Sequence, residues 1–315
     1  MTEVIGHKKI LTYFSAVKKH DRFSHAYCFV GSEHAGKRRV AEEISTQLLG
    51  CNRDDLYNHP DVLYIAQEKN SKTGKTKKDI DIAQLLHVHD RLLRKSFLGG
   101  YTIVIIDGAE KMNISASNAL LKSLEEPRGK TLFFLLTNDE KKLLPTIWSR
   151  CQGIFFHPVA QSEIEVCVKK DISENEKKEL LFLSRGLPGR IMYWQENPEE
   201  YELYKKEIHR FVNIFGKSFH EKREDVEELF GDKTDNILAR KNLVAVLDIW
   251  KLVIHDCLQN EFPGITYEEK PLSLPSRLTP EIGITLYSFI EESQQLLQKN
   301  IHPRLLIEKI LIHIP

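Results

Sequence analysis

The sequence predicts an α/β fold in its first half, a parallel β-sheet covered by helices, followed by an all-helical remainder. Up to about residue 160, short apolar runs alternate with helix-like stretches, which is typical of strands buried between two helical layers. A glycine-rich loop joins the first apolar run to a helix, at the place where such sheets bind ligands. Beyond residue 160, apolar residues recur at helical spacings of three and four.

The first half predicts strands and helices in strict alternation. Each predicted strand is a short apolar run, and Pro127 ends the helix before the fourth strand because proline cannot continue a helix. The predicted strands are residues 26–30, 61–66, 101–106, 131–136 and 153–156. The predicted helices are residues 35–49, 80–93, 115–125 and 143–148.

The second half predicts two helical regions. Short segments at 163–169, 176–184 and 189–194 form a small cluster, and Pro198 opens the second region. Its clearest apolar faces lie at 243–258, 286–297 and 305–311, with a proline-rich connection, Pro263 to Pro280, between two of them. We therefore expect three domains, residues 1–160, 161–197 and 198–315.

Composition limits the classes of partner and compartment. Lys plus Arg and Asp plus Glu are each 45 among 315 residues, giving zero formal net charge, so no global attraction to nucleic acid or anionic membrane is expected. A standalone DNA-binding module therefore has little support. No apolar run approaches the ~20 residues that cross a bilayer, and the first residues lack a signal-peptide layout. Five scattered cysteines suit a reducing cytosol, so we expect a cytoplasmic location.

Residues 31–38 carry a phosphate-binding pattern that stops one residue short. Gly31, Gly36 and Lys37 fit G-x-x-x-x-G-K-[ST], in which backbone N–H groups and the lysine hold phosphates. Arg38 stands where a hydroxyl normally binds Mg²⁺. Arginine has no acceptor for a cation and does not lose its proton in proteins. The loop therefore predicts a phosphate-binding scaffold that lacks a part needed for hydrolysis.

A second apolar strand ends in an aspartate. In ATPases with a phosphate loop, an acid at the position of Asp107 holds Mg²⁺, although a strand-end cap is the alternative. The next position commonly carries an acid that orients the attacking water, and Gly108 occupies it here. Glu110 lies two residues further on, and we do not expect it to substitute. Arg38 and Gly108 together make efficient hydrolysis by this chain improbable.

Two longer motifs carry a family resemblance. Residues 118–127 read Asn-Ala-Leu-Leu-Lys-Ser-Leu-Glu-Glu-Pro, and residues 144–151 read Leu-Pro-Thr-Ile-Trp-Ser-Arg-Cys. Both closely resemble bacterial clamp-loader subunits of the AAA+ superfamily, strongly over residues 1–195 and in architecture only beyond them. The resemblance implies a RecA-like AAA+ domain, a small helical lid and an all-α collar domain.

The resemblance implies that Arg150, rather than the phosphate loop, carries the catalytic role. Among these subunits, motor types keep an intact phosphate loop and an Asp-Glu pair, whereas one type commonly has a degenerate nucleotide site and keeps Ser-Arg-Cys. Arg38 and Gly108 make the chain similar to the second type. Arg150 would then be an arginine finger supplied in trans, a device that contributes ~10³–10⁵ in rate. Ser149 and Cys151 would support its loop, and a structural salt bridge is the alternative for Arg150.

The resemblance also implies vestigial sensors of the nucleotide. Thr137 and Asn138 end a strand where relatives place a polar phosphate sensor, and Arg190 falls where an arginine-based sensor lies. Turn or helix-cap roles remain the alternative for these three residues. The degenerate nucleotide site would comprise Gly31, Gly36, Lys37, Asp107, Thr137, Asn138 and Arg190. Whether ATP and Mg²⁺ still bind stays open. Many relatives carry a four-cysteine zinc module, but only Cys51 remains in that stretch, so no metal site is expected.

These inferences predict a non-hydrolysing, stator-like clamp-loader subunit. It would work with motor ATPase subunits and a delta subunit, and through the complex with a sliding clamp and primer–template DNA. Through that complex it would be part of a DNA polymerase holoenzyme. The alternative function is a catalytically active AAA+ ATPase, a motor-type subunit that hydrolyses ATP despite Arg38.

Overall fold

The computed structural model describes residues 4–315 except 69–76, 78, 95, 98, 128, 170, 231–235, 260–265, 268–269, 272–277, 298 and 300. The chain forms two compact units. The first holds Met1–Ile172 and Leu183–Met192, and the second holds Ser173–Phe182 and Tyr193–Pro315. The division into three domains stays a prediction.

The first unit is built on a five-stranded sheet of order β2-β3-β4-β1-β5, in which every pairing is parallel. The register places Val30 beside Thr137 and Asp107 beside Leu136, so the carboxyl ends of the central strands lie at one edge. The strands are β1 (Ala26–Val30), β2 (Val62–Ile65), β3 (Thr102–Asp107), β4 (Thr131–Thr137) and β5 (Gln152–Phe155).

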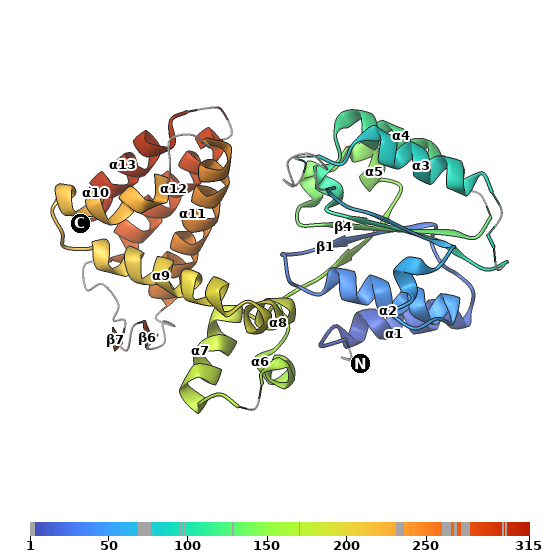
Figure 1. Cartoon of the computed structure of the whole chain (residues 1–315), viewed down its shortest axis with the longest axis horizontal. Helices are drawn as coiled ribbons and strands as arrows, with labels where there is room; N and C mark the ends of the chain where they lie inside the picture. The colour runs from blue at the N-terminus through green and yellow to red at the C-terminus, as the bar shows by residue number, and fades with distance from the viewer. Residues whose placement is uncertain are drawn as a thin grey trace. The chain divides into compact units, whose positions relative to one another are not determined.

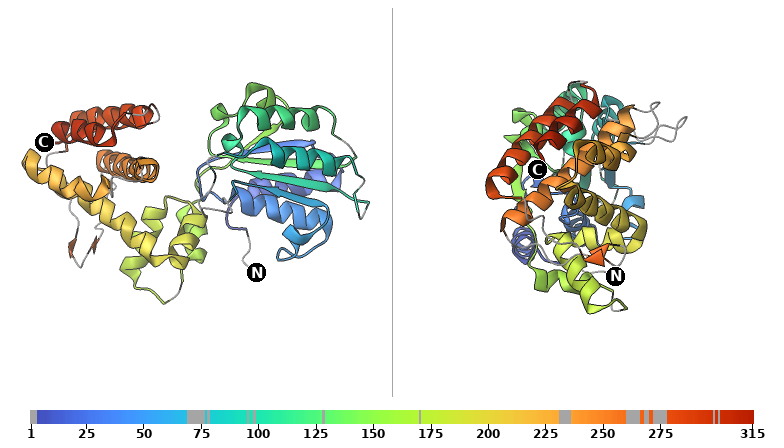
Figure 2. Two further views of the ribbon diagram at one scale, coloured as in Figure 1. Left: turned by 45° about the horizontal axis from the view of Figure 1, so that its top comes forward. Right: turned by 90° about the vertical axis from the view of Figure 1, so that its left-hand side faces the viewer.

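Helices cover both faces of this sheet (Figures 1 and 2). On one face, α1 (Lys8–Lys19) and α2 (Lys37–Leu49) pack on alternate strand residues such as Phe29 and Phe134. On the other face, α3 (Ile82–Leu92), α4 (Ile114–Glu125) and α5 (Pro145–Trp148) pack on the intervening residues. The central strands are apolar throughout because both of their faces are buried.

Capping residues fix where the covering helices begin. The Asp81 carboxylate accepts from the Gln84 N–H and begins α3, and the Asn113 side chain accepts from the Ala116 N–H and begins α4. Each side chain satisfies a backbone donor that the first helical turn leaves unpaired. Short 3₁₀ helices lie at Leu56–Asn58, Ala109–Lys111 and Glu140–Lys142.

The remaining elements are almost entirely helical. They are α6 (Gln161–Ile164), a 3₁₀ turn (Glu165–Cys167), α7 (Glu174–Ser184), α8 (Pro188–Glu196), α9 (Pro198–Ile214), α10 (Phe219–Glu227), a 3₁₀ turn (Glu228–Phe230), α11 (Asn236–Gln259), α12 (Pro280–Leu297) and α13 (Pro303–His313). Two short antiparallel strands, β6 (Thr266–Tyr267) and β7 (Lys270–Pro271), precede α12. Trp250 is fully buried in this unit, with its ring 5.1 Å from that of Phe211.

The observed elements confirm the predicted α/β sheet followed by helices. All five predicted strands are present, within two residues of their expected ends. The sequence patterns missed α1, α10 and the β6–β7 pair. Most of the proline-rich connection, including Pro263 and Pro275, lies outside the described residues. Within the described part of the chain, no helix is both long enough and apolar enough to cross a membrane.

Candidate functional site

The phosphate loop connects β1 to α2 and needs both of its glycines. A Cβ on Gly31 would lie 2.6 Å from the carbonyl oxygen of Phe156, which is closer than a side chain can approach. Gly36 has φ of 95°, a left-handed conformation that side chains rarely adopt. The Gly31 N–H donates to the Thr137 carbonyl at 3.2 Å and fixes the loop to the end of β4.

The loop lysine is already satisfied by protein oxygen atoms. Lys37 is only 8% exposed, and its ammonium donates to the Gly31 carbonyl, the Ser32 carbonyl (2.8 Å) and Asn138 Oδ1 (2.8 Å). An ammonium has three donors, so these bonds use all of them. Burial lowers the pKa of Lys37, while the negative charges of Glu110 and other nearby carboxylates act in the opposite direction.

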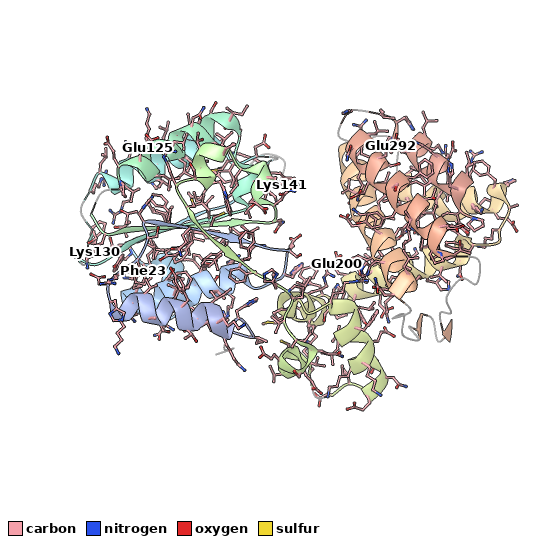
Figure 3. The ribbon with its side chains drawn as sticks, turned by 180° about the vertical axis from the view of Figure 1, so that it is seen from behind. Phe23, Glu125, Lys130, Lys141, Glu200 and Glu292 are labelled. Atoms are coloured by element: carbon pink, nitrogen blue, oxygen red, sulfur yellow. The ribbon has the colours of Figure 1, made fainter. Side chains whose placement is uncertain are left out.

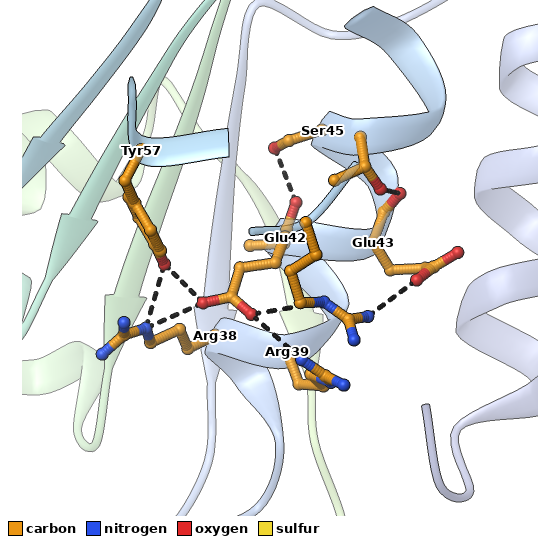
Figure 4. Close-up of polar contacts among 9 residues, drawn as sticks. Arg38, Arg39, Glu42, Glu43, Ser45 and Tyr57 are labelled. Atoms are coloured by element: carbon orange, nitrogen blue, oxygen red, sulfur yellow. Dashed lines mark hydrogen bonds and ion pairs between the residues drawn. The ribbon is translucent and has the colours of Figure 1, made fainter. Parts of the chain in front are cut away.

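Arg38 is part of a polar cluster between α2 and the turn before β2 (Figure 4). Its Nε donates to Glu42 Oε1 at 2.9 Å and to the Tyr57 hydroxyl at 3.0 Å. The Tyr57 hydroxyl in turn donates to the same Glu42 carboxylate. The guanidinium carbon lies 5.3 Å from the ring centroid of Tyr57 and 5.0 Å from that of Tyr64. These contacts give Arg38 the geometry of a structural cation held over aromatic rings.

The aspartate at the end of β3 is bound by the same cluster. The Tyr64 hydroxyl donates to Asp107 Oδ2 at 2.8 Å. Burial, and then the charge of Asp107, raise the pKa of Tyr64, so this hydroxyl keeps its proton and remains a donor. Arg38, Tyr64 and Asp107 therefore form a continuous chain of contacts, which we call the arginine–tyrosine latch.

Gly108 lacks the acidic side chain expected at this position, and its backbone conformation also disfavours one. Its φ of 75° and ψ of 49° are left-handed, and it begins the 3₁₀ turn Ala109–Lys111. A glutamate here would carry the strain of a left-handed side-chain residue. The negative charges of Glu110 and Asp107 both act to raise the pKa of Lys37, and no hydrogen bond joins Glu110 to Lys37 among the described residues.

The residues around the loop do not fit a bound Mg²⁺. This ion prefers oxygen ligands in near-octahedral geometry. Arg38 supplies no oxygen, which leaves Asp107 as the one oxygen ligand of the pair, and one of its two oxygens accepts from the Tyr64 hydroxyl. In the described part of the chain, no three His, Cys, Asp or Glu side chains gather in a way that could hold a metal.

The predicted sensor residues differ in what they contact. Asn138 meets Lys37, as described above. The Thr137 hydroxyl instead donates to the Asp139 carbonyl at 3.0 Å and accepts from the Asp139 N–H at 3.2 Å, so it shapes the turn after β4. Arg190 lies near the loop, because the Gly189 N–H donates to the His34 carbonyl at 3.0 Å. Burial lowers the pKa of His34, and the charge of Arg190 contributes in the same direction.

Arg150 lies just after α5 and is held by two groups of its own chain. Its Nη2 is 2.8 Å from Glu125 Oε1, and its Nη1 donates to the Thr146 carbonyl at 2.9 Å. Figure 3 shows Glu125 at the α4 layer of the first unit. The Arg150 side chain remains 35% exposed. Neither of these two contacts involves the phosphate loop.

The neighbours of Arg150 in the Ser-Arg-Cys triplet have structural contacts. The Ser149 hydroxyl donates to the Thr146 carbonyl at 3.2 Å, the same carbonyl that anchors Arg150. Burial raises the pKa of the Cys151 thiol to about 12, so it is protonated at neutral pH and is a poor nucleophile.

Sequence reasoning missed the partners in both places. Tyr57, Tyr64 and Glu42 hold Arg38, and Glu125 holds Arg150. The i to i+4 spacing of Arg38 and Glu42 was the one local signal available for such a pair. The two tyrosines and Glu125 are distant in sequence from the arginines that they contact.

A family model described as DNA polymerase III, delta subunit, matches residues 6–160. A DNA polymerase III subunit delta' of Pseudomonas aeruginosa is 34% identical over 182 residues, covering 52% of this chain and 54% of that protein. The subunit delta' of Bacillus subtilis is 30% identical over 192 residues, covering 56% of each. The chain thus spans about half the length of the curated relatives that it matches.

A solved structure shows the fold over nearly the whole chain. It is described as a DNA polymerase III gamma subunit-related protein from Thermotoga maritima. It has a TM-score of 0.52 and 19% sequence identity, and the match covers 95% of this chain and 98% of that one. The AAA+ fold implied by the sequence motifs is thereby confirmed. Residues 6–160 thus match the DNA polymerase III delta-subunit family, and the chain is similar to the delta' subunits of the clamp loader.

Proposed function

We propose that the chain is a non-hydrolysing subunit of a bacterial clamp loader and that it supplies Arg150 to the ATP site of a neighbouring subunit. The complex would place a sliding clamp on primed DNA during replication. The relatives named subunit delta' support the place in the complex. The site geometry supports a structural role for Lys37 and a role for Arg150 at the ATP site of a neighbour.

The observation that carries the proposal is the arginine–tyrosine latch. In an active phosphate-loop ATPase, a hydroxyl and an aspartate hold Mg²⁺, which neutralises charge on the β- and γ-phosphates. Here Arg38 stands in place of the hydroxyl, and its guanidinium binds Glu42 and Tyr57. Asp107 accepts a hydrogen bond from the protonated Tyr64 hydroxyl. A guanidinium therefore stands where the metal-binding hydroxyl would be, and one oxygen of Asp107 is already used by a phenol. Gly108, with its left-handed backbone, offers no acid for the attacking water.

Arg150 has the properties that a finger needs. Its guanidinium keeps its charge, and its planar fork can bind phosphate oxygens in pairs. At 35% exposure, and with its backbone directly after α5, it can be reached by another subunit. Its role would be to stabilise the charge that develops on the transferred phosphoryl group of a neighbour. Ser149 and Thr146 would keep its loop in place.

The alternative is a chain that hydrolyses ATP itself. The observation that favours it is the meeting of Lys37 with Asn138, the arrangement expected of a phosphate lysine and a polar sensor. Nucleotide binding and hydrolysis by the purified chain separate the two functions. We expect no Mg²⁺-dependent ATP turnover above background. Turnover that is abolished by Lys37→Ala would establish the alternative.

A reconstituted complex tests the finger. Arg150→Ala should assemble with its partner subunits as the wild type does, because Arg150 is a partly exposed residue outside the core. It should nevertheless lower ATP turnover by the complex. Wild-type turnover in an assembled Arg150→Ala complex would remove the finger assignment.

A further inference from the structure

The carboxylate that holds Arg150 occupies an unfavourable electrostatic position. Glu125 is the last residue of α4, where the helix dipole is negative and disfavours an acid. Glu126 follows directly and adds a second negative charge. Glu125 nevertheless pairs with Arg150 at 2.8 Å, across 25 residues of sequence. An exposed ion pair contributes little stability, so stability alone is a weak reason for this arrangement.

We infer that Glu125 is a positioning residue for Arg150, one that fixes the guanidinium in the orientation needed by the phosphate of a neighbouring subunit. This inference rests on the proposed function of Arg150. Glu125 would touch neither the nucleotide nor the reacting atoms, and it would act only through the arginine.

The hydrogen-bond inventory of the guanidinium allows this role. Arginine carries five N–H donors. One donor on Nη2 serves Glu125, and one on Nη1 serves the Thr146 carbonyl. The remaining three donors include one on each terminal nitrogen, the pair that a phosphate accepts in bidentate fashion. Arg150 can therefore bind phosphate without giving up either anchor.

The benefit of two anchors is lower conformational entropy before docking. A free arginine side chain carries about 2 kcal/mol of rotamer entropy, which is lost when it is fixed on a phosphate. At ~1.4 kcal/mol for each factor of ten, complete pre-organisation is worth at most about 30-fold in rate. Glu125 supplies one of the two anchors, so a loss of about 10-fold is expected on its removal.

Substitution at Glu125 should leave the fold intact. The Glu125 side chain is 49% exposed. It also lines an open cavity of about 360 Å³, together with His89, Lys122, Ser123 and Glu126. With a smaller side chain at this position, water would fill the space that the glutamate leaves, and no void would form in the core. Glu126 is a matched control, because it is the adjacent exposed carboxylate on the same cavity and does not pair with Arg150.

The first experiment uses the isolated full-length chain and phenylglyoxal, a reagent that modifies arginine side chains. Modification of Arg150 is followed by mass spectrometry of its peptide. Glu125→Gln should raise the rate at Arg150 at least about threefold, because it removes the charged partner of the guanidinium. Glu126→Gln should leave that rate at the wild-type value. Equal rates in the wild type and Glu125→Gln would overturn the inference.

The second experiment is a double-mutant cycle in the reconstituted complex, with ATP turnover as the readout. Glu125→Ala should lower the Arg150-dependent rate about 10-fold, Glu125→Gln by less, and Glu126→Ala by less than about twofold. In an Arg150→Ala background, Glu125→Ala should have no further effect, because a residue that acts through Arg150 has nothing left to position.

The outcomes separate the positioning role from the finger itself. An additional loss from Glu125→Ala in the Arg150→Ala background would show a structural role and overturn the positioning. A wild-type rate in Glu125→Ala, combined with a reduced rate in Arg150→Ala, would overturn the positioning alone. A wild-type rate in Arg150→Ala would overturn the finger and the positioning together.

Discussion

The phosphate-loop lysine should behave as a structural residue, and Lys37→Met is the variant that tests this. Methionine keeps the length and most of the packing of the buried side chain while removing its charge. The Gly31 carbonyl, the Ser32 carbonyl and Asn138 Oδ1 would all lose their shared donor. A charge-assisted hydrogen bond contributes about 1.5–3 kcal/mol, and breaking a buried charged network costs about 3–5 kcal/mol.

Burial of the ammonium opposes these hydrogen bonds and lowers the pKa of Lys37, so we take the lower end of this range for the loss. We therefore expect Lys37→Met to lower the free energy of unfolding of the first unit by about 3 kcal/mol. Amide hydrogen exchange with mass spectrometry measures this in the full chain. Peptides from β1 and β4 should exchange at least about 100-fold faster. Peptides from α11 and α13, in the second unit, serve as internal controls.

If Lys37 instead served to bind nucleotide phosphates, the opposite result would be expected. Its lysine would lack protein partners, and removing a buried charge would leave stability unchanged or increase it. Unchanged or slower exchange in β1 and β4 of Lys37→Met would therefore refute the reasoning. Addition of Mg²⁺ and ATP to the wild type should give no protection of these peptides beyond that seen with ATP alone.

Three further predictions concern the surroundings of the loop. Tyr64→Phe should cost about 2 kcal/mol in urea unfolding by removing the hydrogen bond to Asp107, and an unchanged midpoint would contradict the latch. Gly108→Glu should cost about 1–2 kcal/mol through backbone strain without creating ATP turnover; turnover gained by this variant would argue for the active ATPase. Burial lowers the pKa of His7 and His34 from 6.5, so the unfolded chain binds more protons and stability should fall below about pH 6.5. Replacing both with Asn should flatten urea midpoints between about pH 7.5 and 5.5, and a slope as steep as that of the wild type would exclude the two histidines as its source.

The parallel sheet and the phosphate loop could be predicted because their signals are local. A buried strand is a run of apolar residues, and the loop needs glycine at fixed positions, as the contact of Gly31 with Phe156 and the φ of Gly36 illustrate. Helix α1 was missed although its signal is also local: Ile10, Leu11, Phe14 and Val17 recur at spacings of three and four.

The partners of the two arginines could not be predicted, because folding brings them together. Tyr64 reaches Asp107 across 43 residues, and Glu125 reaches Arg150 across 25 residues. A sequence pattern could show that Arg38 departs from a metal-binding hydroxyl. It could not show that aromatic rings and Glu42 hold the guanidinium in another role.

The most direct test of the central claim measures ATP turnover by a complex reconstituted from this chain, motor ATPase subunits and a delta subunit. Arg150→Ala is compared with wild type under single-turnover conditions, after assembly has been verified by size-exclusion chromatography. We expect the hydrolysis step at the neighbouring site to slow by ~10³-fold or more, while the isolated chain shows no turnover of its own. An unchanged single-turnover rate in the assembled Arg150→Ala complex would contradict the account.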